Sequence, residues 1–361
     1  MTKIDRRALL AAPLALSGLT ACDRFAWAQP RPPVVPPLKS IAPFPVGTCV
    51  QSGQTTDPAW VALAAREVSQ LTPEWEMKME YILADGLPGN GGSGLRFDAP
   101  DRIAAFAQAQ GMRLHGHTLI WYAQGAEAFA DLEGPRFVEA FDAYIAAVAG
   151  RYRGKVVSWD VVNEPVTDEG SSLRDCHWSR ALGQDGYILR AFQQARAADP
   201  DAVLFLNDYN LENNPTKGAT FLKLVERLMK AGAPIGGIGS QSHLDIEIPA
   251  GQAAAFIRDA ASLGLPIHIS ELDASLRNGS RLDLRSHATR IEQQSGRVGE
   301  LAEAFTALPA AQRFAFTVWG LRDTDSWLRQ GERDDGKDQP LPFNAAGQPN
   351  PMAAVLARAF A

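Results

Sequence analysis

The chain has 361 residues, of which 46% are hydrophobic and 21% are charged, and this composition is typical of a folded globular protein with a full-sized core. It excludes a disordered or fibrous chain. The formal net charge of -6 argues against nucleic acid as the main partner, because binding to phosphates requires a basic surface.

Residues 1–28 are predicted to be an export signal. They start with basic residues, including Arg6 and Arg7, and continue into an apolar stretch at 8–19 that is too short for a membrane-spanning helix. The two arginines resemble a twin-arginine signal, which exports folded proteins. We therefore expect a periplasmic or extracellular protein.

Two processing patterns compete at the end of this signal. The letters LTAC end at Cys22 and resemble a lipoprotein box, in which a lipid on Cys22 would hold the protein at a membrane. The letters AWA at 26–28 form a small-x-small cleavage site instead. The proline-rich segment 29–43 is predicted to be an extended linker, followed by one folded domain at 44–361.

Strand-like and helix-like segments alternate from residue 46 onward. The predicted strands are 46–50, 67–74, 113–121, 155–164, 202–208, 235–243, 266–273 and 313–320. Helical periodicity is found at 101–111, 136–154, 186–200, 220–232 and 251–264. This α/β alternation predicts a single (β/α)8 TIM barrel. A doubly wound open sheet is the alternative, although no glycine-rich phosphate loop follows the first strand.

The three cysteines cannot all form pairs. Without Cys22, Cys49 and Cys176 remain, and we expect two buried thiols in preference to a disulfide. No set of cysteines and histidines has the spacing of a metal site, so no structural zinc is expected.

Most of the predicted strands begin with apolar residues and end with a chemically active side chain. These strand-end residues are Glu74, Trp121, Glu164, Asp208, His243, Glu271 and Trp319. The carboxyl ends of barrel strands lie on one face, where the active sites of TIM barrels are built. The sequence therefore predicts an active-site cleft at that face.

Two of these residues are glutamates: Glu164 in VVSWDVVNEP and Glu271 in HISELD. One glutamate at a strand end is more often a salt-bridge or helix-cap partner, but two of them among aromatics and amides favour catalysis. Hydrolysis of a glycoside with retention uses such a pair: one carboxyl protonates the leaving oxygen and the other attacks the anomeric carbon, at a separation of about 5 to 5.5 Å. Inversion needs about 6.5 to 9.5 Å, because a water must fit between the carboxyls.

The chain resembles glycoside hydrolase family 10, the endo-β-1,4-xylanases, from about residue 41 to residue 361. The blocks that carry the resemblance are LTPEWEMKME (71–80), GHTLIW (116–121), WDVVNEP (159–165), LFLNDYNLE (204–212), GIGSQSHL (237–244), HISELD (268–273), TVWGLRDTDSWL (317–328) and PLPFNAAGQPNPM (340–352). NEP alone is a weak signal, because many barrel glycosidases contain it. Eight blocks in the same order are specific.

The resemblance implies that Glu164 is the acid/base and Glu271 the nucleophile. His243 would hydrogen-bond the nucleophile, and Asn163 would bind the 2-hydroxyl of the sugar that is cleaved. The other substrate-binding residues that it implies are Glu74, Lys78, His117, Trp121, Tyr209, Gln241, Trp319 and Trp327. It implies no metal and no organic cofactor. From their chemistry alone, His117 and the two later tryptophans could equally be core residues, and Glu74 and Lys78 an ion pair.

Two positions depart from the family pattern. Trp75 stands where the family usually has Asn, and Tyr122 stands where it usually has His. The contacts with the second sugar on the glycone side are therefore expected to differ in this chain.

We therefore expect an exported, retaining endo-β-1,4-xylanase that acts as a monomer on xylan or a related xylose-rich polysaccharide. A different β-glycan is the first alternative, because Trp75 changes the glycone side. A catalytically silent carbohydrate-binding barrel is the second alternative, but such a protein would be expected to lack one of the two glutamates.

Overall fold

The computed structural model describes residues 35–87, 94–277, 283–331 and 336–361. The predicted export signal at 1–28, with Cys22 in it, lies outside these residues. Within the described ranges, no helix combines the length and the apolar character needed to cross a membrane.

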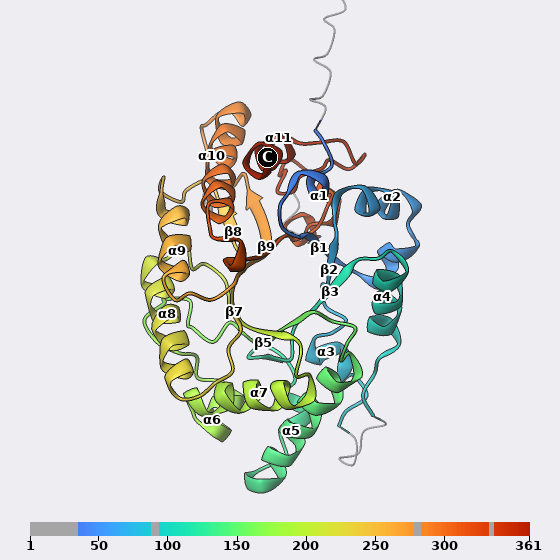
Figure 1. Cartoon of the computed structure of the whole chain (residues 1–361), viewed down its shortest axis with the longest axis vertical. Helices are drawn as coiled ribbons and strands as arrows, with labels where there is room; N and C mark the ends of the chain where they lie inside the picture. Colours follow the sequence, from blue (N-terminus) through green and yellow to red (C-terminus); the bar gives the residue numbers. More distant parts are fainter. Residues whose placement is uncertain (1–34, 88–93, 278–282, 332–335) are drawn as a thin grey trace, which may run out of the picture. The chain divides into compact units, whose positions relative to one another are not determined.

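Parallel strands close into a barrel at the centre of the fold (Figure 1). The barrel strands are β1 (Val46–Val50), β2 (Gln70–Pro73), β3 (Arg113–Gly116), β5 (Ser158–Asn163), β6 (Val203–Asp208), β7 (Gly237–Ser240), β9 (Ile267–Ser275) and β10 (Arg313–Val318). The barrel closes where β10 pairs with β1, and Phe316 lies opposite Val46. Two short strands, β4 (Ile120–Trp121) and β8 (His243–Asp245), pair with the ends of β5 and β9. The predicted (β/α)8 barrel is confirmed.

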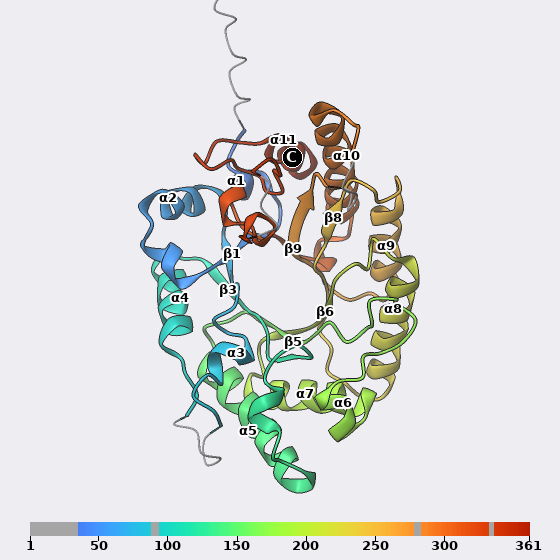
Figure 2. The same cartoon turned by 180° about the vertical axis from the view of Figure 1, so that it is seen from behind.

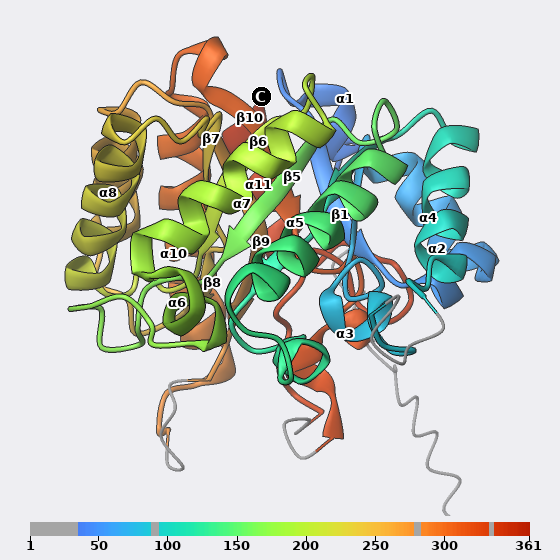
Figure 3. The same ribbon diagram turned by 90° about the horizontal axis from the view of Figure 1, so that it is seen from below.

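Helices form the outer ring of the barrel, as both face-on views show (Figures 1 and 2). The longer helices are α2 (Pro58–Glu67), α4 (Asp98–Ala109), α5 (Gly134–Arg151), α7 (Gln184–Ala198), α8 (Pro215–Lys230), α9 (Gln252–Ala261), α10 (His287–Thr306) and α11 (Pro351–Phe360). Three short helices are α1 (Leu38–Ile41), α3 (Met79–Ile82) and α6 (His177–Leu182). The side view shows α3 and α6 at the lower end of the barrel, toward which the arrow of β5 points (Figure 3).

Local sequence explains how these helices form and which face they bury. In α8, the side chain of Asn214 accepts hydrogen bonds from two free backbone N–H groups of the first turn, and Pro215 occupies the first helical position. Apolar residues then recur at intervals of three and four, and the buried ones include Phe221, Leu224, Val225 and Leu228. Each such side chain stabilises the packing of the helix on the barrel by roughly 1.5–3 kcal/mol.

Within the predicted linker 29–43, residues 38–41 form helix α1, which packs on the folded domain before the predicted boundary at residue 44. Helix α1 packs against α2 and α11. Leu38 is 1% exposed, and its backbone N–H donates to the buried carboxylate of Glu67 at 2.9 Å. Leu38 thus provides a hydrogen-bond donor for a buried carboxylate and buries its own apolar side chain. A proline-rich composition does not predict either interaction.

Element boundaries differ from the prediction in several places. The predicted strand 113–121 is two strands, β3 and β4, and the predicted strand 235–243 contains β7 and only the first residue of β8. The predicted strand 67–74 begins one residue inside α2. Cys49 and Cys176 are buried free thiols, as predicted.

Candidate active site

A cavity of about 440 Å³ opens at the carboxyl ends of the strands. Every catalytic and substrate-binding residue predicted from the sequence lines it, together with Gln51 and Trp75. The full lining is Gln51, Glu74, Trp75, Lys78, His117, Trp121, Asn163, Glu164, Tyr209, Gln241, His243, Glu271, Trp319 and Trp327. The barrel therefore brings together residues that are up to 276 positions apart in the chain, the span from 51 to 327.

Glu164 lies directly after β5, and donors hold both of its carboxyl oxygens. Its Oε2 accepts from the indole Nε1 of Trp121 at 2.9 Å, and its Oε1 accepts from Gln241 at 2.9 Å and Asn163 at 3.1 Å. Its backbone has φ +59°, in the left-handed region, while its N–H donates to the carbonyl of Asn207. A non-glycine residue held in this region costs about 1–3 kcal/mol, and such strain concentrates at functional sites.

Glu271 lies within β9, next to an imidazole that a second acid orients. Its Oε1 accepts from Asn207 Nδ2 at 3.0 Å, and its Oε2 lies 3.5 Å from His243 Nε2. The other ring nitrogen of His243 lies 2.9 Å from Asp273 Oδ2, which also accepts from the indole of Trp327 at 2.7 Å. Asp273 and Glu271 therefore hold the imidazole between them.

The charges around Glu271 favour its ionised form. Burial raises the pKa of Glu271, but its electrostatic interactions with His117, His243 and Lys78, with a hydrogen bond from His243, outweigh burial and leave the pKa below its ordinary value. Burial lowers the pKa of His243, but Asp273 and Glu271 raise it by more than burial lowers it, and the resulting pKa is about 10. At neutral pH the site thus contains an imidazolium beside a carboxylate.

Three amides connect the two glutamates. Asn207 donates both to Glu271 Oε1 and to Asn163 Oδ1, each at 3.0 Å. Gln241 donates to Asn163 Oδ1 at 3.2 Å as well as to Glu164. Because each donor is shared, the two carboxyls cannot move independently. This arrangement fixes the positions of the two acids relative to each other.

Below the cavity, a buried acid holds two histidines inside the barrel. Asp160 Oδ2 lies 2.8 Å from His117 Nδ1 and 2.9 Å from His115 Nε2, and His115 Nδ1 lies 2.7 Å from Ser158 Oγ. Burial raises the pKa of Asp160, but the two imidazoles and their hydrogen bonds lower it well below its ordinary value. His117 is therefore anchored from below, with its ring in the cavity lining.

One wall of the cavity carries Glu74 and Lys78. Glu74 Oε2 accepts from Gln51 Nε2 at 2.9 Å, and the Lys78 ammonium lies 4.9 Å from the ring centre of Trp121 and 6.0 Å from that of Trp319. Burial raises the pKa of Glu74, and hydrogen bonding to Gln51 and the charge of Lys78 offset only part of that rise. These side chains present an acceptor and a cation to the cavity.

The two positions that depart from the family pattern have defined surroundings. Trp75 is 41% exposed at the cavity wall and packs edge-on against Tyr81, with ring centres 5.1 Å apart. Tyr122 lies under the guanidinium of Arg174, whose central carbon is 4.1 Å from the ring centre. Arg174 in turn donates to the carbonyl of Glu164 at 3.0 Å and to the hydroxyl of Tyr209 at 2.9 Å.

A buried ion pair supports the backbone beside Glu164. The Lys217 ammonium lies 2.9 Å from Asp208 Oδ1, and both side chains are fully buried. Asp208 also accepts from the backbone N–H groups of Val166 at 3.0 Å and Tyr209 at 2.9 Å. Asp208 thus ties the residues that follow Glu164 to the end of β6, and Lys217 compensates its charge.

Potential metal ligands lie close together at one point among the described residues. Donor atoms of His117, Asp160 and Glu271 all lie within 4.8 Å of one another, and all three residues are buried. The hydrogen bond between His117 and Asp160 and the opposite charges around Glu271 account for this proximity without a cation.

The comparison with protein families decides the classification. The sequence model of "Glycosyl hydrolase family 10" matches residues 39–359. The chain belongs to this family. Among curated relatives, endo-1,4-beta-xylanase A of Cellvibrio japonicus is 34% identical over 346 residues, which cover 87% of this chain and 55% of that protein. Endo-1,4-beta-xylanase of Geobacillus stearothermophilus is 35% identical over 320 residues, with coverages of 85% and 93%.

Solved structures agree with the family assignment. A thermostable mutant of a xylanase from Cellvibrio japonicus superimposes with a TM-score of 0.79 at 32% identity, covering 90% of this chain and 99% of that one. Xylanase B of Clostridium stercorarium F9 gives a TM-score of 0.78 at 29% identity, with coverages of 90% and 99%. The chain spans about half the length of the Cellvibrio curated relative and 29% of a second one, Exoglucanase XynX of Acetivibrio thermocellus.

Sequence reasoning missed several residues that support the site. Asp273 could have been found, because it follows Glu271 by two positions on a strand, where alternate residues share a face. Gln51 could have been found from its position, because it directly follows β1 at the end of the barrel where the cavity opens. Asp160 and His115 lie among apolar residues within their strands, and neither gives a local signal that distinguishes it from an ordinary core polar residue.

Proposed function

We propose that the protein is a retaining endo-1,4-β-xylanase that cleaves internal bonds of xylan. The observation that carries the proposal is the pair Glu164 and Glu271, two buried carboxyls on one cavity whose oxygens are joined through shared amides. A retaining glycosidase needs one acid that keeps its proton and one that has lost it. The cationic side chains around Glu271 support its role as the ionised member.

In the first step, Glu164 donates its proton to the glycosidic oxygen, and a Glu271 oxygen bonds to the anomeric carbon as the leaving sugar departs. This gives a covalent glycosyl ester on Glu271. In the second step, the Glu164 carboxylate takes a proton from a water, whose oxygen attacks the same carbon and releases Glu271. Two inversions at one carbon give net retention.

Other side chains of the cavity bind and orient the sugar. Asn163 and Gln241 both donate to Glu164 Oε1, so they orient the acid and lie beside it where a sugar hydroxyl can be bound. The indoles of Trp121, Trp319 and Trp327 provide faces for the C–H faces of a sugar. His243, held by Asp273, donates to Glu271 and stabilises the carboxylate as it leaves the ester.

We propose further that the protein is exported and acts as a monomer. The basic and apolar pattern at residues 1–28 supports export, and LTAC supports a lipid at Cys22 as one form of it. One chain supplies all the side chains of the cavity, so the chemistry needs no second subunit.

The deciding experiment follows reducing ends and anomeric configuration together. The purified protein is incubated with xylan, mixed-linkage β-glucan and cellulose, and a soluble xylo-oligosaccharide is monitored by proton NMR from the first minutes. Release of β-anomers from xylan supports the proposal. Initial release of α-anomers would exclude double displacement, and preference for β-glucan would favour the alternative substrate that Trp75 and the relative named Exoglucanase XynX suggest. Binding of xylan without turnover would favour the silent barrel.

A further inference from the structure

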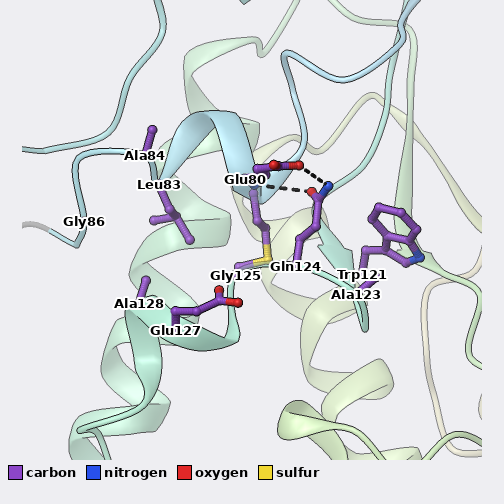
Figure 4. Close-up of a pocket in the computed structure, with 11 residues that line it drawn as sticks. Glu80, Leu83, Ala84, Gly86, Trp121, Ala123, Gln124, Gly125, Glu127 and Ala128 are labelled. Atoms are coloured by element: carbon purple, nitrogen blue, oxygen red, sulfur yellow. Dashed lines mark hydrogen bonds between the residues drawn. The ribbon is translucent and has the colours of Figure 1, made fainter. Parts of the chain in front are cut away.

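A second cavity, of about 660 Å³, lies beside the active-site cavity and shares Trp121 with it. It lies between α3 and the loop 122–129 that follows β4 (Figure 4). The indole Nε1 of Trp121 donates to Glu164, and Figure 4 shows this nitrogen pointing away from the other lining residues. A single indole therefore separates the second cavity from the acid/base.

Specific contacts hold the walls of this second cavity in place. Gln124 donates to Glu80 Oε2 at 2.7 Å and accepts from the backbone N–H of Glu80 at 3.3 Å, so the loop is tied to the start of α3. Gly125 has φ +83°, and a Cβ at that position would lie 2.8 Å from the sulfur of Met79. Only glycine allows the loop to approach α3 so closely. The second cavity is therefore a built feature of the fold.

The lining has the chemistry of a sugar site. Met79 and Leu83 provide a buried apolar floor, and Trp121 provides an aromatic wall. Glu80 projects from α3 and Glu127 from the opposite 3₁₀ turn (Figure 4). Carboxylate oxygens accept hydrogen bonds from hydroxyls, and indoles pack on C–H faces. The volume lies within the range of about 300–1,000 Å³ that is typical of small-ligand sites.

The charge of the second cavity selects among sugars. Its ionisable lining residues are Glu80 and Glu127, and both are acids. Two carboxylates repel an anionic ligand such as a uronic acid, whereas they accept hydrogen bonds from a neutral pentose or hexose at no electrostatic cost. The second cavity therefore fits a neutral sugar.

We propose that the second cavity binds one neutral sugar residue of the polysaccharide whose backbone occupies the active-site cavity. This inference rests on the proposed xylanase function and adds to it a determinant of substrate choice. A chain or branch that passes Trp121 reaches both cavities, because that residue lines both. The bound residue is either a further backbone unit or a branch sugar, and both offer the same hydroxyl and C–H groups.

The test compares kcat/KM of the wild type, Glu127→Ala and Ala128→Leu on three sets of substrates. These are an aryl xylobioside, linear xylo-oligosaccharides of increasing length, and the same oligosaccharides with one arabinosyl branch. Removing the acceptor or filling the second cavity should lower kcat/KM about tenfold, or about 1.4 kcal/mol, on substrates that reach it. The aryl xylobioside should be unaffected. Glu226→Ala, an exposed acid on α8, is the matched control and should leave all three sets unchanged.

Each outcome separates this inference from the function on which it rests. A loss that appears with increasing chain length, on linear and branched substrates alike, identifies a backbone unit, and a loss confined to the branched substrates identifies a branch sugar. Equal kcat/KM values for variants and wild type on every set, or an equal loss on every set, would refute sugar binding in the second cavity and leave the proposed xylanase function untouched. A wild type that fails to cleave the aryl xylobioside would overturn the proposed function as well.

Discussion

Replacing His243 with Gln should raise the pKa of Glu271, because it removes a positive charge that lies 3.5 Å from the carboxylate. At an effective dielectric constant of about 20, two unit charges at that distance attract each other by about 5 kcal/mol. One pKa unit corresponds to about 1.4 kcal/mol, so the largest possible rise is about 3.5 units. Lys78 and His117 remain and His243 is partly exposed, so we expect a rise of about one to two units.

The assay is the pH dependence of kcat/KM on an aryl xylobioside. Such a leaving group needs no proton from Glu164, so the acid limb reports the ionisation of Glu271. Glu271 must be ionised to attack; a higher pKa therefore moves the acid limb to higher pH. The double variant His243→Gln/Asp273→Asn removes the uncompensated charge of Asp273 and should move the limb part of the way back. An acid limb that stays in place in the single variant would refute the electrostatic role of His243.

The remaining predictions concern catalysis, substrate choice and stability. Glu271→Ala should lower kcat by several orders of magnitude with unchanged circular dichroism, and comparable turnover would remove this residue from the nucleophile role. Glu164→Ala should lower activity on xylan about 10²- to 10⁴-fold but spare aryl glycosides with good leaving groups, so equal losses on both would contradict the acid assignment. Trp75→Asn should change the product lengths more than the rate of bond cleavage, and an unchanged product pattern would exclude a sugar contact. Lys217→Met should lower the free energy of unfolding in urea by about 3–5 kcal/mol, because it leaves Asp208 buried without its partner. Adding Asp208→Asn should recover part of this loss, and an unchanged urea midpoint in the single variant would show that the pair carries no stability.

The sequence predicts the barrel well because most barrel strands are short apolar runs that end at a polar or aromatic residue. The run 46–50 coincides with β1, and 202–208 exceeds β6 by one residue. Errors occur where local pattern and tertiary pairing disagree. The stretch 113–121 is predicted as one continuous strand, but Gly116 ends β3, and only Ile120 and Trp121 pair again with β5. Periodicity cannot detect such a break, because it is made by the neighbouring strand.

The residues that line the cavity were easier to predict than those that support it. Several lining residues, among them Glu74, Asn163 and Glu164, lie at or directly after a strand end, where a change from apolar to polar marks them in the sequence. A supporting residue such as Asp160 is defined by its partners, His115 and His117, which lie more than forty positions away. Only the fold brings them to one oxygen. Lys217 is a second case: helical periodicity places it on the buried face with Phe221 and Leu224, but a lysine is ordinarily exposed, and only the fold supplies its partner Asp208.

The two departures from the family pattern leave the bond-breaking centre alone. Trp75 contacts Tyr81 at the edge of the cavity, and Tyr122 contacts Arg174. Neither forms a hydrogen bond with the carboxyl oxygens of the two acids. The oxygens of Glu164 accept hydrogen bonds from an indole and two amides, and those of Glu271 contact an amide and an imidazole. The chemistry at the anomeric carbon can therefore stay constant while these two positions change which chains are bound, because neither side chain forms a hydrogen bond with the carboxyl oxygens that react.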